Sequence, residues 1–322
     1  MSTTQSPKEL DPNRLKNSMI PLIILLIIGS VVGVTLGGFI SMTYVGATAS
    51  FWTVSHQMAA VSVGITFALF LVPLWGLLAG TIFASEATSS IRNRLDVKLV
   101  PDNHPIAIRA QELAASLDLP PINYIGYYKG EEINAFAAGI DRRNAMIAFS
   151  DGAIGKLNKD EFEAVMAHEI GHIANNDMAR MTYARSFQSS LTWFLMFKKL
   201  KNLARWMFTF VSEIGIMALS RSREYRADAI AAALIHPDAM ISALKAIEQD
   251  QVMPPSNQKL FSNFMFRANP AGLFDTHPTL EKRIHAIETE RYIKELPFTI
   301  PDSQSNEIPT ATEPLAPEAF YG

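Results

Sequence analysis

The first quarter of the chain is dominated by apolar residues. From Asn17 to Ser85 the sequence contains no Asp, Glu, Lys or Arg. Two stretches within this run, from about residue 19 to 40 and from about residue 58 to 83, each exceed the roughly 20 residues that cross a hydrocarbon core. The pattern predicts two transmembrane helices in residues 19–84, joined by a short external loop whose aromatic residues suit a membrane interface.

Basic residues flank this apolar run on both sides, and the loop within it has none. Lys and Arg near the ends of membrane helices favour the cytoplasmic side. We therefore expect residues 1–18 and the chain after residue 84 to face the cytoplasm, in a multi-pass protein of the inner or plasma membrane. The flanking basic residues are Lys8, Arg14, Lys16, Arg92, Arg94 and Lys98.

A cleaved signal peptide is the competing interpretation of the first apolar stretch. The small residues Ala47-Thr48-Ala49 offer a cleavage site. However, the apolar stretch is longer than the roughly 7–15 residues of a usual signal core. The second stretch would anchor the chain in either case.

After Ser85 the pattern becomes that of a globular domain, which we assign to residues 85–300. Apolar residues at helical spacing predict four helices, which begin near Pro105, Asn158, Pro237 and Pro278. Two short runs of β-branched and aromatic residues, 122–128 and 145–149, predict strands. The domain should therefore be mainly α-helical with a small β-sheet.

The segment between the two predicted strands has two interpretations. It reads Asn134-Ala135-Phe136-Ala137-Ala138-Gly139. Its small residues would let another backbone approach, as an edge strand requires when it pairs with an extended peptide. A glycine-containing turn explains the composition equally well.

Composition narrows the possible functions. The 322 residues carry a net charge of −3, which does not favour nucleic acid as a partner. Cysteine is absent, so any zinc must be held by His and carboxylate ligands. Residues 301–322 contain four acidic residues, four prolines and no basic residue, and we expect them to form a disordered acidic tail.

The strongest chemical signal is the HExxH sequence from His168 to His172. Positions four apart lie on one face of a helix, so these two imidazoles can hold one metal ion, for which zinc is the default. Glu169 projects close enough to take a proton from a water molecule at that metal. The alternative is a core helix with two incidental histidines, but this spacing is far more restrictive than a lone histidine.

A catalytic zinc ion needs a third protein ligand. Glu224 is the best candidate, and Asp228 lies one turn further on the same helical face. Asp228 could accept the free ring N–H of a ligating histidine, most suitably His168, and so fix its tautomer. The alternative is a solvated charged face on which both carboxylates pair with nearby arginines.

Four motifs in order resemble the HtpX-like membrane zinc endopeptidases, a family that also includes the CAAX prenyl proteases. The motifs are 134–139, 168–177, 220–228 and 276–278. The resemblance implies a zincin-like fold of the gluzincin type and one Zn²⁺ per chain, held by His168, His172 and Glu224. It also implies that Glu169 is the general base and acid, that Asp228 supports a ligand, and that residues 134–139 bind the substrate backbone.

The interval between HExxH and Glu224 departs from that family. HtpX-like proteins commonly place two further membrane segments there. Here the apolar parts, 191–197 and 206–219, are too short to span and are separated by basic residues. A basic amphipathic helix on an anionic membrane surface and a core helical hairpin both fit, and two further spans are a third possibility.

His277 is the last candidate residue. It could steady the oxyanion of a peptidase reaction, or it could belong only to the cap of the final helix, Thr276-His277-Pro278.

The expected activity is hydrolysis of peptide bonds in membrane or misfolded proteins at the lipid bilayer, the quality-control role that the resemblance implies. A CAAX-type prenyl protease and a membrane chaperone or scaffold with a structural zinc are the alternatives.

Overall fold

The computed structural model describes residues 53–182, 223–252 and 278–290, together with Leu296 and scattered positions between residues 27 and 46. The chain divides into two compact units. One contains Ala87–Ala179 and the described C-terminal helices, and the other contains most of helix α2, Val54–Arg94. Within the part of the chain that the structure describes, no helix is both long and apolar enough to cross a membrane.

Several predictions from the sequence fall on residues outside the described ranges. They concern most of the first apolar stretch, the interval 183–222, His277 and the tail 301–322.

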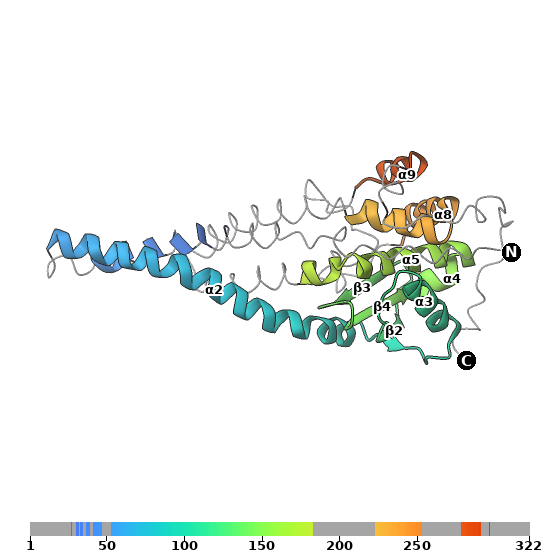
Figure 1. Ribbon diagram of the computed structural model, residues 1–322, viewed down its shortest axis with the longest axis horizontal. Helices are drawn as coiled ribbons and strands as arrows, with labels where there is room; N and C mark the ends of the chain where they lie inside the picture. The colour runs from blue at the N-terminus through green and yellow to red at the C-terminus, as the bar shows by residue number, and fades with distance from the viewer. Residues whose placement is uncertain are drawn as a thin grey trace, which may run out of the picture. The chain divides into compact units, whose positions relative to one another are not determined.

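The first unit is mainly helical around a small mixed sheet (Figure 1). Its strands are β1 (Lys98–Leu99), β2 (Tyr124–Tyr128), β3 (Ala135–Gly139) and β4 (Ala145–Ser150). They lie in the order β1-β2-β4-β3, in which β2 and β4 are parallel and the other two pairs are antiparallel. The predicted architecture, mainly α with a small sheet, is confirmed.

The helices of this unit include α3 (Pro105–Ala115), α4 (Asp151–Lys156), α5 (Lys159–Ala174), α8 (Pro237–Gln249) and α9 (Leu280–Glu288). Four of these five begin close to the predicted places, and the short helix α4 was not predicted. The final helix starts later than predicted: Thr279 occupies its N-cap position and makes no side-chain capping hydrogen bond. The prediction that Thr276-His277-Pro278 caps this helix is therefore wrong.

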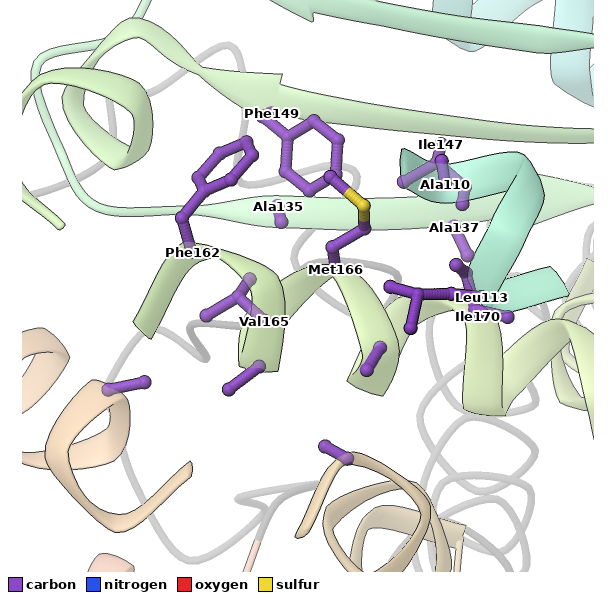
Figure 2. Packing of buried hydrophobic residues seen from close by; sticks show 14 of the residues in the cluster. Ala110, Leu113, Ala135, Ala137, Ile147, Phe149, Phe162, Val165, Met166 and Ile170 are labelled. Carbon is purple, nitrogen blue, oxygen red and sulfur yellow. The ribbon is translucent and has the colours of Figure 1, made fainter. Parts of the chain in front are cut away.

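One face of the sheet packs against α5 and α3. Ala135 and Ala137 of β3 and Phe149 of β4 face Phe162 and Met166 of α5 in a buried cluster (Figure 2). The rings of Phe149 and Phe162 are 4.8 Å apart. This packing fixes α5, which carries the HExxH sequence, directly against the strand at the edge of the sheet.

The opposite face of the sheet carries a smaller cluster. Tyr128 and Phe136 lie there with ring centroids 5.6 Å apart, and Ile91 at the end of α2 packs with them. Because side chains alternate along a strand, Phe136 faces this cluster whereas its neighbours Ala135 and Ala137 face α5. The sheet is thus covered on both faces.

Candidate metal centre

Helix α5 begins with a reciprocal capping box. The Asn158 side chain accepts a hydrogen bond from the Glu161 backbone N–H, and the Glu161 carboxylate accepts one from the Asn158 backbone N–H. These bonds satisfy backbone donors that a helix start leaves without intrahelical partners. The apolar positions of α5 face the core, so the helix is fixed in both register and rotation.

His168 and His172 lie one turn apart on α5, as the spacing predicts. Their rings meet edge to face with centroids 4.7 Å apart. Their Nε2 atoms are 3.1 Å apart. The two nitrogens therefore converge on one point beside the helix.

A second helix, residues 223–234, packs closely against α5 at Gly171. A Cβ atom at Gly171 would lie only 3.2 Å from the Cα of Ala227. The glycine therefore permits a backbone approach that a larger residue would oppose. This approach places Glu224 and Asp228, which lie either side of Ala227, against the two histidines.

Glu224 completes a group of three converging donors. Its carboxylate oxygens lie 3.7 Å from the Nε2 atom of His168 and 3.7 Å from the Nε2 atom of His172. One donor atom from each residue lies within 4.8 Å of the others. Glu224 is only 2% exposed, so the interpretation of a solvated charged face is wrong for it, as it is for the equally buried Asp228.

The spacing of these donors fits a zinc ion. Two ligand bonds of about 2.05 Å at a tetrahedral angle separate their donors by about 3.3 Å. The two Nε2 atoms are 3.1 Å apart, close to that value, and each of them lies 3.7 Å from a different oxygen of Glu224. His168, His172 and Glu224 could therefore hold a metal ion, with two nitrogens and one carboxylate as the protein's contribution.

Each histidine contacts a carboxylate through its other ring nitrogen. Nδ1 of His168 lies 3.0 Å from Oδ1 of Asp228. Nδ1 of His172 lies 3.3 Å from Oδ2 of Asp177. A proton on each Nδ1 leaves the Nε2 lone pairs directed toward the metal position. Asp228 thus lies where the sequence placed it, beside His168.

Two residues of this surrounding shell received no role in the sequence interpretation. Asp177 follows Asn176, whose positive φ of 58° turns the chain back toward α5. Arg283 of α9 donates to both carboxylate oxygens of Asp228. Its position could have signalled burial, though not the partner, because Arg283 shares a helical face with the apolar residues Leu280 and Ile287.

Burial and neighbouring charges shift the pKa values of the histidines and of Glu169 at the centre. Burial lowers the pKa of His168 to about 4. Burial raises the pKa of Glu169 to about 8, and the nearby Glu224 adds to the rise. Burial also opposes the charged form of His172, but Asp177 and Glu224 outweigh it and raise its pKa. A divalent cation would offset the repulsion between the Glu169 and Glu224 carboxylates. It would also compete with protons for the same donor atoms.

The strand prediction for residues 134–139 is confirmed, because β3 spans Ala135–Gly139 at the edge of the sheet, and the interpretation as a turn is wrong. Ser150 N–H donates to Asn134 C=O, so Asn134 faces β4. Since backbone groups alternate in direction, Ala135 and Ala137 direct theirs to the outer edge. Accordingly, the Ala137 backbone N–H acts on the carboxylate of Glu169 and opposes the rise in its pKa.

The described site combines a helix bearing HExxH, a facing carboxylate and an edge strand beside the glutamate. These features define a class, the metal-dependent peptidases with an HExxH helix. Residues 102–291 match the model of peptidase family M48. The chain belongs to peptidase family M48.

Curated relatives agree with this assignment and with the predicted HtpX-like resemblance. Protease HtpX of Pseudoalteromonas atlantica is 33% identical over 202 residues, a match that covers 56% of this chain and 69% of the relative. Protease HtpX of Stutzerimonas stutzeri is 36% identical over 191 residues, covering 51% and 65% of the two chains.

A solved structure is also similar. The crystal structure of S. mikatae Ste24p is 20% identical, with a TM-score of 0.45 over 84% of this chain and 66% of that chain. A likeness at this level adds nothing to the assignment, which stands on the family model and the curated relatives.

Proposed function

We propose that this chain is a membrane-anchored zinc endopeptidase of the gluzincin type. One zinc ion is held by His168, His172 and Glu224, and Glu169 is the general base and acid. The observation that carries the proposal is the convergence of these three residues: the two Nε2 atoms are 3.1 Å apart, and one donor atom from each residue lies within 4.8 Å of the others. Membership of peptidase family M48 supports the reaction class.

Bound zinc would acidify a water molecule and polarise the scissile carbonyl. Glu169 accepts the proton of the attacking water and returns it to the nitrogen of the leaving amine. The charge of His172 and the Ala137 backbone N–H both act on its carboxylate. Burial raises the pKa of Glu169, and a zinc ion beside it would lower that pKa and favour the ionised form that accepts a proton.

The substrate backbone binds residues 134–139, along the outer edge of β3. Ala135 and Ala137 direct backbone groups to that edge, and Glu169 meets the same edge at Ala137. An extended peptide added there would place its carbonyl groups close to Glu169. Peptides N-methylated at single positions test this step: methylation of an amide that pairs with β3 should abolish cleavage, and equal cleavage of every methylated peptide would contradict it.

Membrane anchoring rests on the apolar run before residue 85. It is supported by large apolar side chains that α2 leaves 52–69% exposed, namely Val63, Phe70, Leu74, Leu78 and Ile82. We propose two spans in residues 19–84, a protease domain in residues 85–300 on the cytoplasmic side, and membrane or misfolded proteins as substrates. Extraction of the chain from membranes by alkaline carbonate would contradict this anchoring.

The decisive experiment compares wild type with Glu169→Gln in detergent. We expect both to bind one zinc ion, because Glu169 is not among the three donors. Only the wild type should cleave casein, because glutamine cannot accept the water proton. Equal cleavage by the two proteins would contradict the role of Glu169, and zinc binding without cleavage by either would indicate a scaffold. Preferential cleavage of a prenylated peptide would indicate a CAAX-type enzyme instead.

A further inference from the structure

The C-terminal helix α9 brings a buried arginine to the metal centre. Arg283 is only 5% exposed, although arginine is rarely buried without a partner. It lies on the face of α9 that also carries Ile287, and α9 packs beside α8 (Figure 1). The helix therefore directs a permanent positive charge into the protein interior.

Arg283 contacts Asp228 at two points. Its Nε donates to Oδ2 over 2.8 Å, and its Nη2 donates to Oδ1 over 2.6 Å. A planar guanidinium that meets both oxygens fixes the plane of the carboxylate as well as its position. Asp228 cannot rotate about its side-chain bonds without breaking one of these contacts.

The same Asp228 oxygen serves both the arginine and the histidine. Oδ1 accepts from Nη2 of Arg283 and lies 3.0 Å from Nδ1 of His168. His168 is fully buried and directs Nε2 toward His172 and Glu224. The orientation of the His168 ring is thus set by an oxygen whose own place is set by Arg283.

We propose that Arg283 is a positioning residue of the peptidase, which orients His168 for zinc through its two-point contact with Asp228. This rests on the proposed function, because it takes His168 as a zinc ligand. The metal centre is then completed by α9, which lies far along the chain from the HExxH helix. Both side-chain hydrogen bonds described for Arg283 go to Asp228, so its effect on the zinc ion is transmitted chiefly through this carboxylate.

A simple structural role for Arg283 makes a different prediction. If the arginine only held α9 in place, any change that loosens α9 would weaken zinc binding equally. Ile287 supplies the matched control, because it is a buried residue of α9 that packs into the core cluster. Ile287→Ala should lower the melting temperature while leaving the contacts of Asp228 in place.

The test measures zinc affinity of the full chain in detergent, by competition with a chelator, for wild type, Arg283→Gln and Ile287→Ala. Loss of a group that orients a metal ligand typically lowers affinity by about 10–100-fold, which we expect for Arg283→Gln. Cobalt substituted for zinc should also show an altered visible absorption spectrum in Arg283→Gln. Ile287→Ala should keep wild-type affinity and spectrum.

A double-mutant cycle with Asp228→Asn tests the route of the effect. If Arg283 acts through Asp228, Arg283→Gln should cause no further loss of affinity in the Asp228→Asn background. Independent, multiplying losses would overturn the proposal. Arg283→Lys covers the case in which Arg283→Gln fails to fold: it keeps the charge but loses the fork, so weakened zinc binding is expected and wild-type affinity overturns the proposal.

The outcomes separate this inference from the proposed function. Wild-type affinity and spectrum in Arg283→Gln would overturn the role of Arg283 alone, and so would an equal loss in Ile287→Ala. Zinc affinity that is the same in His168→Ala as in the wild type would overturn the zinc site itself, and the positioning role with it.

Discussion

A methyl group added at Gly171 should separate the two helices that form the metal centre. The new Cβ atom would lie 3.2 Å from the Cα of Ala227 and 3.4 Å from the Cβ of Ile230. Favourable carbon–carbon contacts lie at about 3.5–4.0 Å. A backbone Cα cannot rotate away, so the helix of residues 223–234 must move back by a few tenths of an ångström.

Two opposing effects decide the stability of Gly171→Ala. Alanine favours a helix over glycine by about 0.8–1.0 kcal/mol. Overpacking of a core by one methyl group costs about 1–3 kcal/mol. The net destabilisation should therefore lie between about 0 and 2 kcal/mol, so the fold should survive.

Zinc affinity should respond more clearly than stability. Glu224 lies on the displaced helix, and its oxygens are already 3.7 Å from the two histidine nitrogens. If zinc must draw the helices back together against about 1.4 kcal/mol of strain, affinity falls about tenfold. Chelator competition measures this change, and thermal unfolding of the metal-free protein measures the change in stability.

Gly155→Ala is the matched control. It places the same substitution in helix α4, where a Cβ atom would meet nothing within 4 Å. We expect wild-type zinc affinity and equal or slightly greater stability for this variant. Equal zinc affinity in Gly171→Ala and Gly155→Ala would contradict the predicted separation of the two helices.

Two further substitutions, with one control, address the ligand set and the start of the HExxH helix. Glu224→Ala should abolish stoichiometric zinc binding, because two histidines alone make a weak site; unchanged zinc content by atomic absorption would place the third ligand elsewhere. Asn158→Ala should destabilise the metal-free protein by about 1 kcal/mol, because it breaks the capping box. Thr279→Ala, at an N-cap without a side-chain hydrogen bond, should have almost no effect on the melting temperature, and an equal drop in both variants would argue against the capping account.

Local patterns in the sequence were sufficient for the elements that carry the site. The capping pair Asn158 and Glu161 and the apolar stripe after it predict α5, and both are present as predicted. The pairing of Glu224 with the two histidines could be proposed because HExxH leaves a ligand missing. The choice between a strand and a turn for residues 134–139 needed the structure, because small residues suit both and only pairing with β4 distinguishes them.

Contacts between distant segments could not be read from the chain. Arg283 meets Asp228 across 55 positions of sequence, and no spacing rule connects them. The turn at Asn176, which directs Asp177 to His172, depends on a single positive φ angle. Two short elements, β1 and α4, were missed because two or six residues carry too little periodicity to be recognised.

The central claim is that His168, His172 and Glu224 hold a catalytic zinc ion. Zinc K-edge X-ray absorption of the purified wild-type chain tests it most directly. We predict a first shell of two imidazole nitrogens with oxygen donors, at distances of about 2.0–2.2 Å. Glu224→Ala should lose this signal. A first shell of three or more imidazoles, or a wild-type spectrum from Glu224→Ala, would contradict the account.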